Sequence, residues 1–356
     1  MKMNRYVKRY LVDAMSGMAQ GLFASLLTGT IVRTLGQQLL RLGDNAFFQF
    51  MVKAGDFACD PHVVGAAMAV GIGYAMQVPA LVLFSLAAVG SAANVVGGAG
   101  GPLAVLVIAI IAAETGCLVS KKTKVDILVT PLVTILAGAL LTVLTAKYIG
   151  IAAAAVGQFL VWSTKLHPFW MGMIVAMVAG MALTLPISSA AICAAFGLTG
   201  LAGGAALAGC CAQMVGFAVM SFRENRWGGI ISQGLGTSML QMPNIIRNPR
   251  IWIPPILSSL IAGPVATCLF KLEMNGAAVS SGMGTCGLVG QIGVITGWFE
   301  PSEAALAHGA AAMAPAAMDW LGLILVSFVL PAVLCWIFSL VLRKTGWIRE
   351  GDLKLE

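Results

Sequence analysis

The stretch LAVLVIAIIAAETGCLVS, residues 103–120, decides the fold class. It holds one ionisable residue, Glu114, among apolar and small residues, and the basic run KKTK (121–124) follows it directly. About 20 predominantly apolar residues are enough for a helix to cross the hydrocarbon core of a bilayer. The stretch therefore predicts a membrane-spanning helix that ends at a cytoplasmic basic loop.

The rest of the chain has the same character. Of its 356 residues, 59% are hydrophobic and 10% are charged, and the mean hydropathy is +0.93. Soluble domains have about 25% charged residues, so this chain has too few polar groups to cover a globule in water. We expect an all-α polytopic membrane protein with about 8–10 transmembrane helices. No stretch is long and polar enough to form a separate soluble domain, so residues 1–356 are expected to form one membrane domain.

The net charge of +7 has a simple origin in this setting. The basic residues fall mostly in short gaps between apolar runs, as the positive-inside rule predicts, and no basic face with interleaved aromatic residues indicates a nucleic-acid partner. The basic N-terminus leads into a long apolar stretch without a convincing cleavage site, which favours a retained first helix. We expect a membrane protein whose two termini, including the polar tail 343–356, are cytoplasmic.

These charges raise a question about the first third of the chain. The N-terminus and residues 121–124 are both basic, which requires an even number of crossings between them, yet three apolar segments are apparent. Either one segment is interfacial or re-entrant, or a break near Pro79 divides the run 63–90. Residues 36–60 mix charges with Leu, Phe and Met, which suits an amphipathic interfacial segment. Residues 91–102 look too rich in glycine for a regular helix.

Two similar glycine motifs lie in the second half of the chain. GLGTS begins at residue 234 and GMGTCG begins at residue 282. The second fits the G-x-G-x-x-G template of dinucleotide-binding loops, but no alternating strand pattern surrounds it, so nucleotide binding is not expected. Non-helical backbone survives at membrane depth where protein or a watery cavity satisfies its polar groups. The two motifs therefore predict paired re-entrant turns, with helix packing through small residues as the alternative.

Candidate solute ligands follow from these turns and from other polar residues in apolar runs. Stretches 183–200, 230–250 and 276–297 are the expected re-entrant regions, and Pro186 breaks the first of them. Glu114 either faces a cavity or lies near the cytoplasmic interface, and His167 either contacts the solute or belongs to an interfacial loop. The candidate substrate-binding residues are Ser188, Ser189, Thr237, Ser238, Gln241, Asn244, Thr285, Gln291, Glu114 and His167.

Enzyme and metal chemistry are not expected. The eight cysteines form no C-x-x-C pair and the three histidines are far apart, so neither a metal site nor a catalytic residue is predicted, and no cofactor is expected.

Several long blocks resemble a known family. LPISSAAI (185–192), GLAGGAALAGC (200–210), QMVGFAVMSFRENRWGG (213–229), QGLGTSMLQMPNIIRNPRIWIPP (233–255) and GMGTCGLVGQIG (282–293) resemble the EIIC-like membrane family of the bacterial phosphotransferase system. More narrowly, they resemble the branch that contains the perfringolysin O regulator. The resemblance implies an EIIC-like transporter fold with re-entrant hairpins in the bacterial inner membrane, and commonly a homodimer.

Classical members of that family carry a sugar while a partner EIIB domain phosphorylates it. We expect no fused EIIA or EIIB domain, and residues 1–356 lack the Asn-Glu-Pro motif of many sugar permeases; FEP (299–301) is only a partial match. We therefore expect a transporter for a small polar solute, such as a sugar or related metabolite, that works by alternating access without coupled phosphorylation. Its expected partners are the solute, membrane lipid and a separate EIIB-like protein. The alternative is a membrane sensor that influences gene expression without transport.

Overall fold

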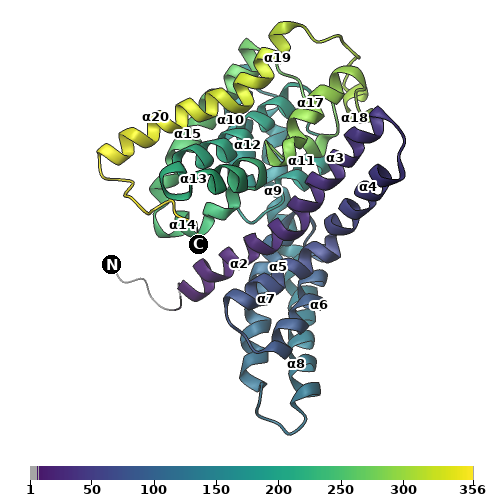
Figure 1. Cartoon of the computed structure of the whole chain (residues 1–356), viewed down its shortest axis with the longest axis vertical. Helices are drawn as coiled ribbons and strands as arrows, with labels where there is room; N and C mark the ends of the chain where they lie inside the picture. Colours follow the sequence, from purple (N-terminus) through teal and green to yellow (C-terminus); the bar gives the residue numbers. More distant parts are fainter. Residues whose placement is uncertain (1–5, 7, 356) are drawn as a thin grey trace. The chain divides into compact units, whose positions relative to one another are not determined.

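A computed structural model describes residue 6 and residues 8–355. In these residues the chain forms helices and turns and no strand, and one isolated antiparallel bridge pairs Gly200 with Met274 (Figure 1). The all-α prediction is therefore confirmed. The chain divides into two compact units, residues 1–153 and 154–356.

The first unit is built from long helices with short breaks. Its elements are η1 (Lys8–Asp13), α2 (Ala14–Leu22), η2 (Phe23–Leu27), α3 (Thr28–Leu42), α4 (Ala46–Cys59), α5 (Pro61–Ala75), α6 (Ala80–Gly97), η3 (Gly98–Gly100), α7 (Gly101–Val119), α8 (Asp126–Leu141), η4 (Thr142–Ala146) and α9 (Lys147–Ser163), the last of which continues into the second unit.

The second unit contains more and shorter elements. They are α10 (Pro168–Thr184), α11 (Ser189–Ala195), α12 (Gly200–Met220), α13 (Phe222–Ile231), η5 (Ser232–Gly236), η6 (Ser238–Gln241), α14 (Met242–Arg247), η7 (Pro249–Trp252), α15 (Ile253–Pro264), η8 (Val265–Leu269), α16 (Ala278–Ser281), η9 (Cys286–Leu288), α17 (Val289–Phe299), α18 (Glu303–Ala307), α19 (Ala317–Ile324), η10 (Leu325–Val329) and α20 (Leu330–Lys344).

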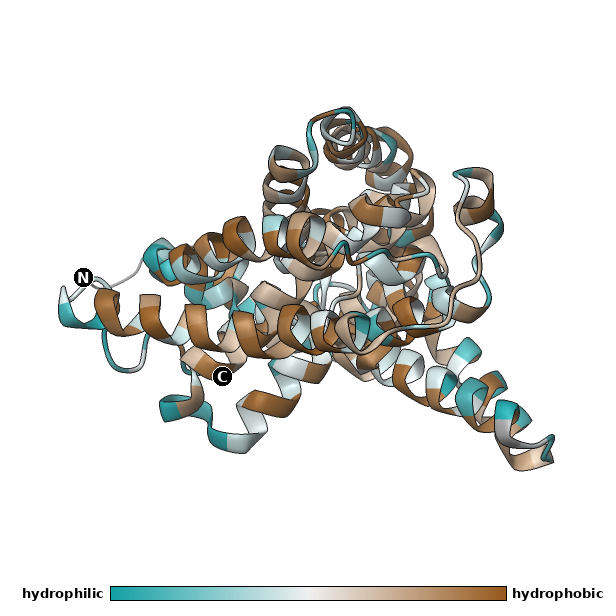
Figure 2. Ribbon diagram, turned by 90° about the horizontal axis from the view of Figure 1, so that it is seen from above, coloured by the Kyte–Doolittle hydropathy of each residue, from teal (hydrophilic) through white to brown (hydrophobic). Residues whose placement is uncertain are grey.

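Apolar helices of membrane length occur throughout the described chain. Six helical stretches are long and apolar enough to cross a bilayer: Lys8–Arg41, Ala80–Val119, Asp126–Ser163, Gly200–Met220, Pro249–Leu269 and Ala317–Lys344. Shorter apolar helices cover Pro61–Ala75, Pro168–Thr184 and Cys286–Phe299. The ribbons are brown, the colour of hydrophobic residues, along most helices, and teal gathers at turns and helix ends (Figure 2). This pattern is that of a polytopic membrane protein.

The stretch Ala80–Val119 is a hairpin of two helices, α6 and α7. Gly98 turns the chain with φ of 52°, a conformation that side chains other than glycine rarely adopt. The helices then run antiparallel, since a Cβ on Gly101 would lie 2.4 Å from Asn94 Oδ1 and one on Gly116 would lie 3.0 Å from Val82. The prediction that residues 91–102 do not form a regular helix is confirmed only for Gly98–Gly100, because α6 continues to Gly97 and α7 begins at Gly101.

The question about the first third of the chain has a structural answer. The helix α5 ends at Ala75 and α6 begins at Ala80, with Pro79 as its N-terminal cap residue and Gln77 in a left-handed conformation. The two helices run antiparallel, because Asn94 of α6 donates a 2.8 Å hydrogen bond to the carbonyl of Pro61 at the start of α5. The break near Pro79 therefore exists. Four apolar helical stretches, an even number, lie between residue 8 and the basic loop.

The core of the second unit is α12, which is almost completely buried. Glycine lets neighbouring helices approach its backbone closely: a Cβ on Gly209 would lie 1.8 Å from the carbonyl oxygen of Ala176 on α10, and one on Gly216 would lie 2.5 Å from Cys335 Sγ on α20. Such small-residue contacts are the usual way in which helices pack in a membrane. The helix α12 therefore carries the contacts on which the candidate site is built.

Candidate functional site

Three interrupted stretches of the second unit meet the helix α12. Residues 185–199 hold α11 between two turns, residues 232–252 consist of η5, η6, α14 and η7, and residues 274–288 hold α16 and η9 between irregular segments. These stretches overlap the three regions predicted to be re-entrant, 183–200, 230–250 and 276–297. At membrane depth, the N–H and C=O groups of such interrupted, non-helical backbone need hydrogen-bond partners from the protein or from water. The hydrogen bonds of these stretches therefore indicate where a polar solute could also bind.

The first stretch connects two parallel helices. Thr184 at the end of α10 bonds to Gln213 of α12, while Gly180 and Ala176 of α10 contact Gly209, so α10 and α12 run in the same direction. Residues 185–199 must therefore return the chain to the end at which α10 began. They do so as an interrupted segment, with α11 between two turns, and the re-entrant interpretation of residues 183–200 stays a prediction.

The two Gly-x-Gly-Thr turns are in direct contact. The hydroxyl of Thr285, in the second turn, donates a hydrogen bond to the carbonyl oxygen of Gly234, in the first, and lies 3.6 Å from Met214 Sδ of α12. Gly284 has φ of 57°, and a Cβ there would lie 2.9 Å from the backbone of Cys210. We call this contact, made by Gly234 and Thr285 next to Met214, the turn contact.

The first stretch joins the same region through its serines. Ser189 Oγ donates a 2.7 Å hydrogen bond to the carbonyl oxygen of Gly282, the first residue of the second turn. Ser188 Oγ accepts from the amide of Ala191 at 3.2 Å and so caps α11. Thr237 has the same kind of role, since its Oγ1 accepts from the amide of Met239 at 3.2 Å. Of these residues, Ser189 is the one that connects two of the interrupted stretches.

Ser238 belongs to a buried polar cluster around Gln213. Its hydroxyl is 2.8 Å from that of Thr184, and Thr184 in turn lies 3.2 Å from Gln213 Oε1. The indole Nε1 of Trp252 donates to the same Oε1 at 2.8 Å. Because an indole N–H can only donate, the oxygen of the Gln213 amide must face Trp252, and the NH₂ group faces away. That NH₂ group has no hydrogen-bond partner among residues 8–355.

Gln291 has a second buried amide with one unpartnered atom. Its Nε2 is 3.4 Å from Cys211 Sγ, and its Oε1 has no hydrogen-bond partner in the described part of the chain. A thiol donates and accepts only weakly, so this amide can turn and offer either its oxygen or its NH₂ group to a ligand. At about 100° per residue along α12, Gln213 and Cys211 project on opposite sides of Met214. The two amides therefore flank the turn contact.

Gln241 and Asn244, both predicted to bind solute, instead hold the end of the chain. Gln241 Nε2 donates to the carbonyl of Leu353 at 2.9 Å and to Gln233 Oε1 at 2.8 Å. Asn244 Nδ2 donates to Gln241 Oε1 at 2.8 Å and to the carbonyl of Lys354 at 2.9 Å. The tail was predicted only as a polar cytoplasmic segment, yet Leu353 is fully buried. The polar turn 241–248 thus forms a binding surface for the chain's own tail.

Replacing Asn248 by Ala should release this tail. Asn248 Nδ2 donates to the carbonyl of Trp347 at 3.0 Å and to Asp352 Oδ2 at 2.7 Å, and its Oδ1 caps η7 at Arg250. Losing a cap costs about 1 kcal/mol and each hydrogen bond a similar amount, so cleavage by trypsin after Arg349 should accelerate at least about fivefold. Asn45→Ala is the matched control, because Asn45 caps α4 in the first unit. Equal cleavage rates in the two variants would contradict the tail's attachment.

The remaining two candidates have other partners. Glu114, in the first unit, forms an ion pair with Arg9 at 3.0 Å, and both side chains are more than one-third exposed. His167 is exposed at the start of α10, where its Nδ1 accepts from the amide of Phe169 at 3.4 Å. Neither is part of the turn contact, and we leave both out of the proposed site.

Sequence reasoning missed Gln213, Thr184 and Trp252. A signal for Gln213 was available, because a lone amide in the apolar run of α12 is costly in a membrane and usually has a function or a specific partner. Thr184 and Trp252 gave no such signal, since their role depends on contacts between distant helices. Among the described residues, no group of three or more His, Cys, Asp or Glu side chains is placed to hold a metal ion.

Comparison with known proteins gives one match. A family model described as the EIIC component of the phosphotransferase system matches residues 12–355. No curated protein and no solved structure matches the chain.

Proposed function

The chain belongs to the EIIC family of the phosphotransferase system, and we propose that it carries a small neutral solute rich in hydroxyl groups, such as a sugar, by alternating access. Membership makes it a multi-pass bacterial membrane protein, a transporter subunit that moves a solute and partners with EIIB-type components. Which solute it carries, and how, are argued from the second unit.

The turn contact is the observation on which the proposal depends. Two buried amides, of Gln213 and Gln291, have unpartnered polar atoms on either side of it. An unpartnered buried amide costs about 1–3 kcal/mol, which a bound hydroxyl group would recover because it both donates and accepts. Both amides are neutral, so they suit a neutral solute. Interrupted helices are the usual source of solute sites in transporters.

The two ends of the second unit differ in their charge. The ends of α10, α12 and α20 and the start of α15 lie together, as the contacts of Gln213 with Thr184 and Trp252 and of Arg343 with Met220 show. Segments 221–252 and 343–354 at this end carry eight basic residues and three acidic ones. Segments 165–167, 270–275 and 299–319 at the other end carry two basic and four acidic residues. By the positive-inside rule, we propose that the basic end is cytoplasmic.

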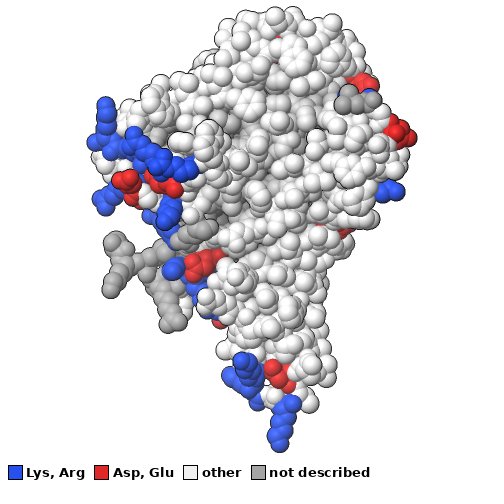
Figure 3. Space-filling view, viewed as in Figure 1, with Lys and Arg blue, Asp and Glu red and all other residues white. Residues whose placement is uncertain are grey.

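Figure 3 shows where Lys and Arg side chains gather on one face of the molecule. On the face shown they cluster over the end of α20 and its surroundings, and again over the connection between α7 and α8. We propose, by the same rule, that both clusters are cytoplasmic.

We propose further that movement of the solute does not require its phosphorylation by this chain's partner. The Asn-Glu-Pro motif of many sugar permeases is absent from residues 1–356. FEP (299–301) matches it only in part, and its Glu300 is exposed just beyond α17 rather than at the turn contact. Vesicles that contain the purified protein alone should therefore accumulate labelled solute in unmodified form. Uptake that appears only when an EIIB protein and a phosphate donor are supplied would reject this part of the proposal.

A panel of radiolabelled hexoses and hexitols, offered to proteoliposomes, tests the proposed function. We expect protein-dependent uptake of at least one of them. In the Gln291→Met variant, which keeps the side-chain volume but removes the amide, the half-saturating concentration should rise about 2- to 13-fold, as expected for one lost hydrogen bond. Gln158→Met, on an exposed position of α9, is the control and should behave as wild type.

One result would reject transport, and another would reject the role of Gln291. Binding of a panel member without any flux would favour the membrane sensor instead. Uptake that is unchanged in Gln291→Met would remove this residue from the solute path.

A further inference from the structure

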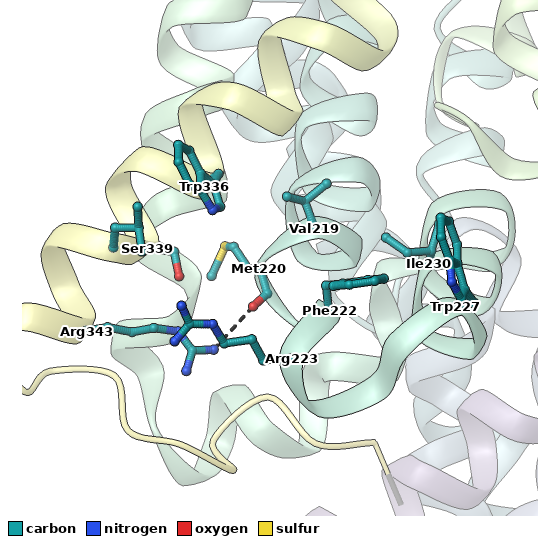
Figure 4. Close-up of a pocket in the computed structure, with 10 residues that line it drawn as sticks. Val219, Met220, Phe222, Arg223, Trp227, Ile230, Trp336, Ser339 and Arg343 are labelled. Atoms are coloured by element: carbon teal, nitrogen blue, oxygen red, sulfur yellow. Dashed lines mark hydrogen bonds between the residues drawn. The ribbon is translucent and has the colours of Figure 1, made fainter.

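A groove lies at the basic end of the second unit, away from the turn contact. It has a volume of about 350 Å³ and runs between the end of α12, the helix α13 and the last turns of α20 (Figure 4). Apolar side chains form most of its walls: Val219, Phe222, Trp227, Ile230, Trp336 and Leu340.

Two arginines line this groove, and only one of them forms an ion pair with a carboxylate. Arg343 donates to Glu224 Oε1 at 2.8 Å and to the carbonyl of Met220 at 3.2 Å, and Glu224 is almost completely buried. Arg223 is exposed and forms no hydrogen bond or ion pair with any other described residue. The three charged groups at the groove therefore leave one positive charge, that of Arg223, without a counter-ion.

The surroundings of the groove are those of a membrane interface. Trp227 is 71% exposed and Trp336 is 54% exposed, and the large apolar side chains Ile337 and Val341 are exposed on the same helix as Trp336. Exposed tryptophans mark the level of lipid headgroups, and arginine reaches that level with its charge while its stem stays against apolar surface. In Figure 4, Arg223 from α13 and Arg343 from α20 lie on the same side of Trp336.

We propose that this groove binds one anionic phospholipid. The phosphate group contacts the guanidinium of Arg223, and an acyl chain lies along the apolar walls toward Trp336. The cytoplasmic leaflet, which the positive-inside rule assigns to this end, is where anionic lipid gives the surface its negative potential. A zwitterionic lipid fills the same apolar walls but leaves the charge of Arg223 less well compensated, so the site distinguishes lipids by headgroup charge.

Fluorescence quenching by brominated lipids tests this proposal, because Trp227 and Trp336 line the groove. The purified protein in detergent is titrated with brominated phosphatidylglycerol and, separately, with brominated phosphatidylcholine. We expect the anionic lipid to quench at a concentration at least about fivefold lower, as one interfacial arginine allows. Arg223→Ala should abolish this preference, while Arg223→Lys should keep most of it.

The controls separate this site from general charge and from free phosphate. Lys344→Ala removes an exposed charge at the same end that does not line the groove, and it should leave the preference unchanged. Trp227→Phe and Trp336→Phe should each reduce the quenchable signal. Equal quenching by the two lipids in wild type, or an unchanged preference in Arg223→Ala, would overturn the proposal. Displacement of the lipid by millimolar inorganic phosphate would overturn it in favour of a free-phosphate site.

Discussion

Thr285→Val should reduce solute uptake by at least about fivefold while the protein stays folded. Valine has nearly the shape of threonine, so the variant removes the hydroxyl that donates to the Gly234 carbonyl and little else. A buried carbonyl that loses its donor costs about 1–3 kcal/mol, which corresponds to a factor of about 5 to 150. The two glycine turns then lose the hydrogen bond that joins them. Initial uptake rates in proteoliposomes measure the effect.

Two variants make this result specific to the turn contact. Thr285→Ser keeps the hydroxyl and should retain at least about half of the wild-type rate, because the donor remains. Thr267→Val removes a comparable buried hydroxyl, which donates to the carbonyl of Pro168 at 2.9 Å, away from the turn contact. It should lower the thermal midpoint but leave uptake unchanged. If Thr267→Val and Thr285→Val reduced uptake equally, the turn contact would have no special role.

Gly209→Val should prevent the second unit from folding correctly. A Cβ at this position would lie 1.8 Å from the carbonyl oxygen of Ala176 and 2.4 Å from its carbon, both of which are backbone atoms that no rotamer change can move. The helices α10 and α12 would have to separate, which would also move Thr184 away from Gln213. We expect a loss of at least about 3 kcal/mol, at the upper end of overpacking effects.

Size-exclusion chromatography of the detergent-solubilised protein measures this outcome. Gly209→Val should give little monodisperse protein and a thermal midpoint far below that of wild type. Gly228→Ala is the control, because a Cβ at Gly228 of α13 has no heavy atom within 4 Å. A monodisperse Gly209→Val protein with a wild-type midpoint would mean that α10 and α12 do not pack as described.

The sequence predicted features that depend on local composition. Apolar runs separated by basic gaps indicated a polytopic helical membrane protein, and the family match supports that class. The repeated Gly-x-Gly-Thr motif indicated a pair of turns, and Thr285 and Gly234 are in fact joined by a hydrogen bond. In both cases the signal and the structure depend on the same short segment, since glycine and small hydroxyl residues allow irregular backbone wherever they occur.

Features that depend on distant partners could not be predicted in the same way. Gln241 and Asn244 looked like solute ligands, but the acceptors that engage them, Leu353 and Lys354, lie more than 100 residues away in the sequence. The composition of residues 91–102 indicated that they do not form a regular helix, but only the fold shows that the break is confined to Gly98–Gly100. Composition shows that a polar group needs a partner, but only the fold shows which partner it has.

The most direct test of the central claim, that solute binds at the turn contact, is hydrogen–deuterium exchange on the wild-type protein. The probe is the hexose or hexitol that the proteoliposomes take up, added at saturating concentration. We predict slower amide exchange in peptides covering residues 232–241 and 282–291, and unchanged exchange in peptides from α8. Protection confined to other segments, with both glycine turns exchanging as in the solute-free protein, would contradict the account.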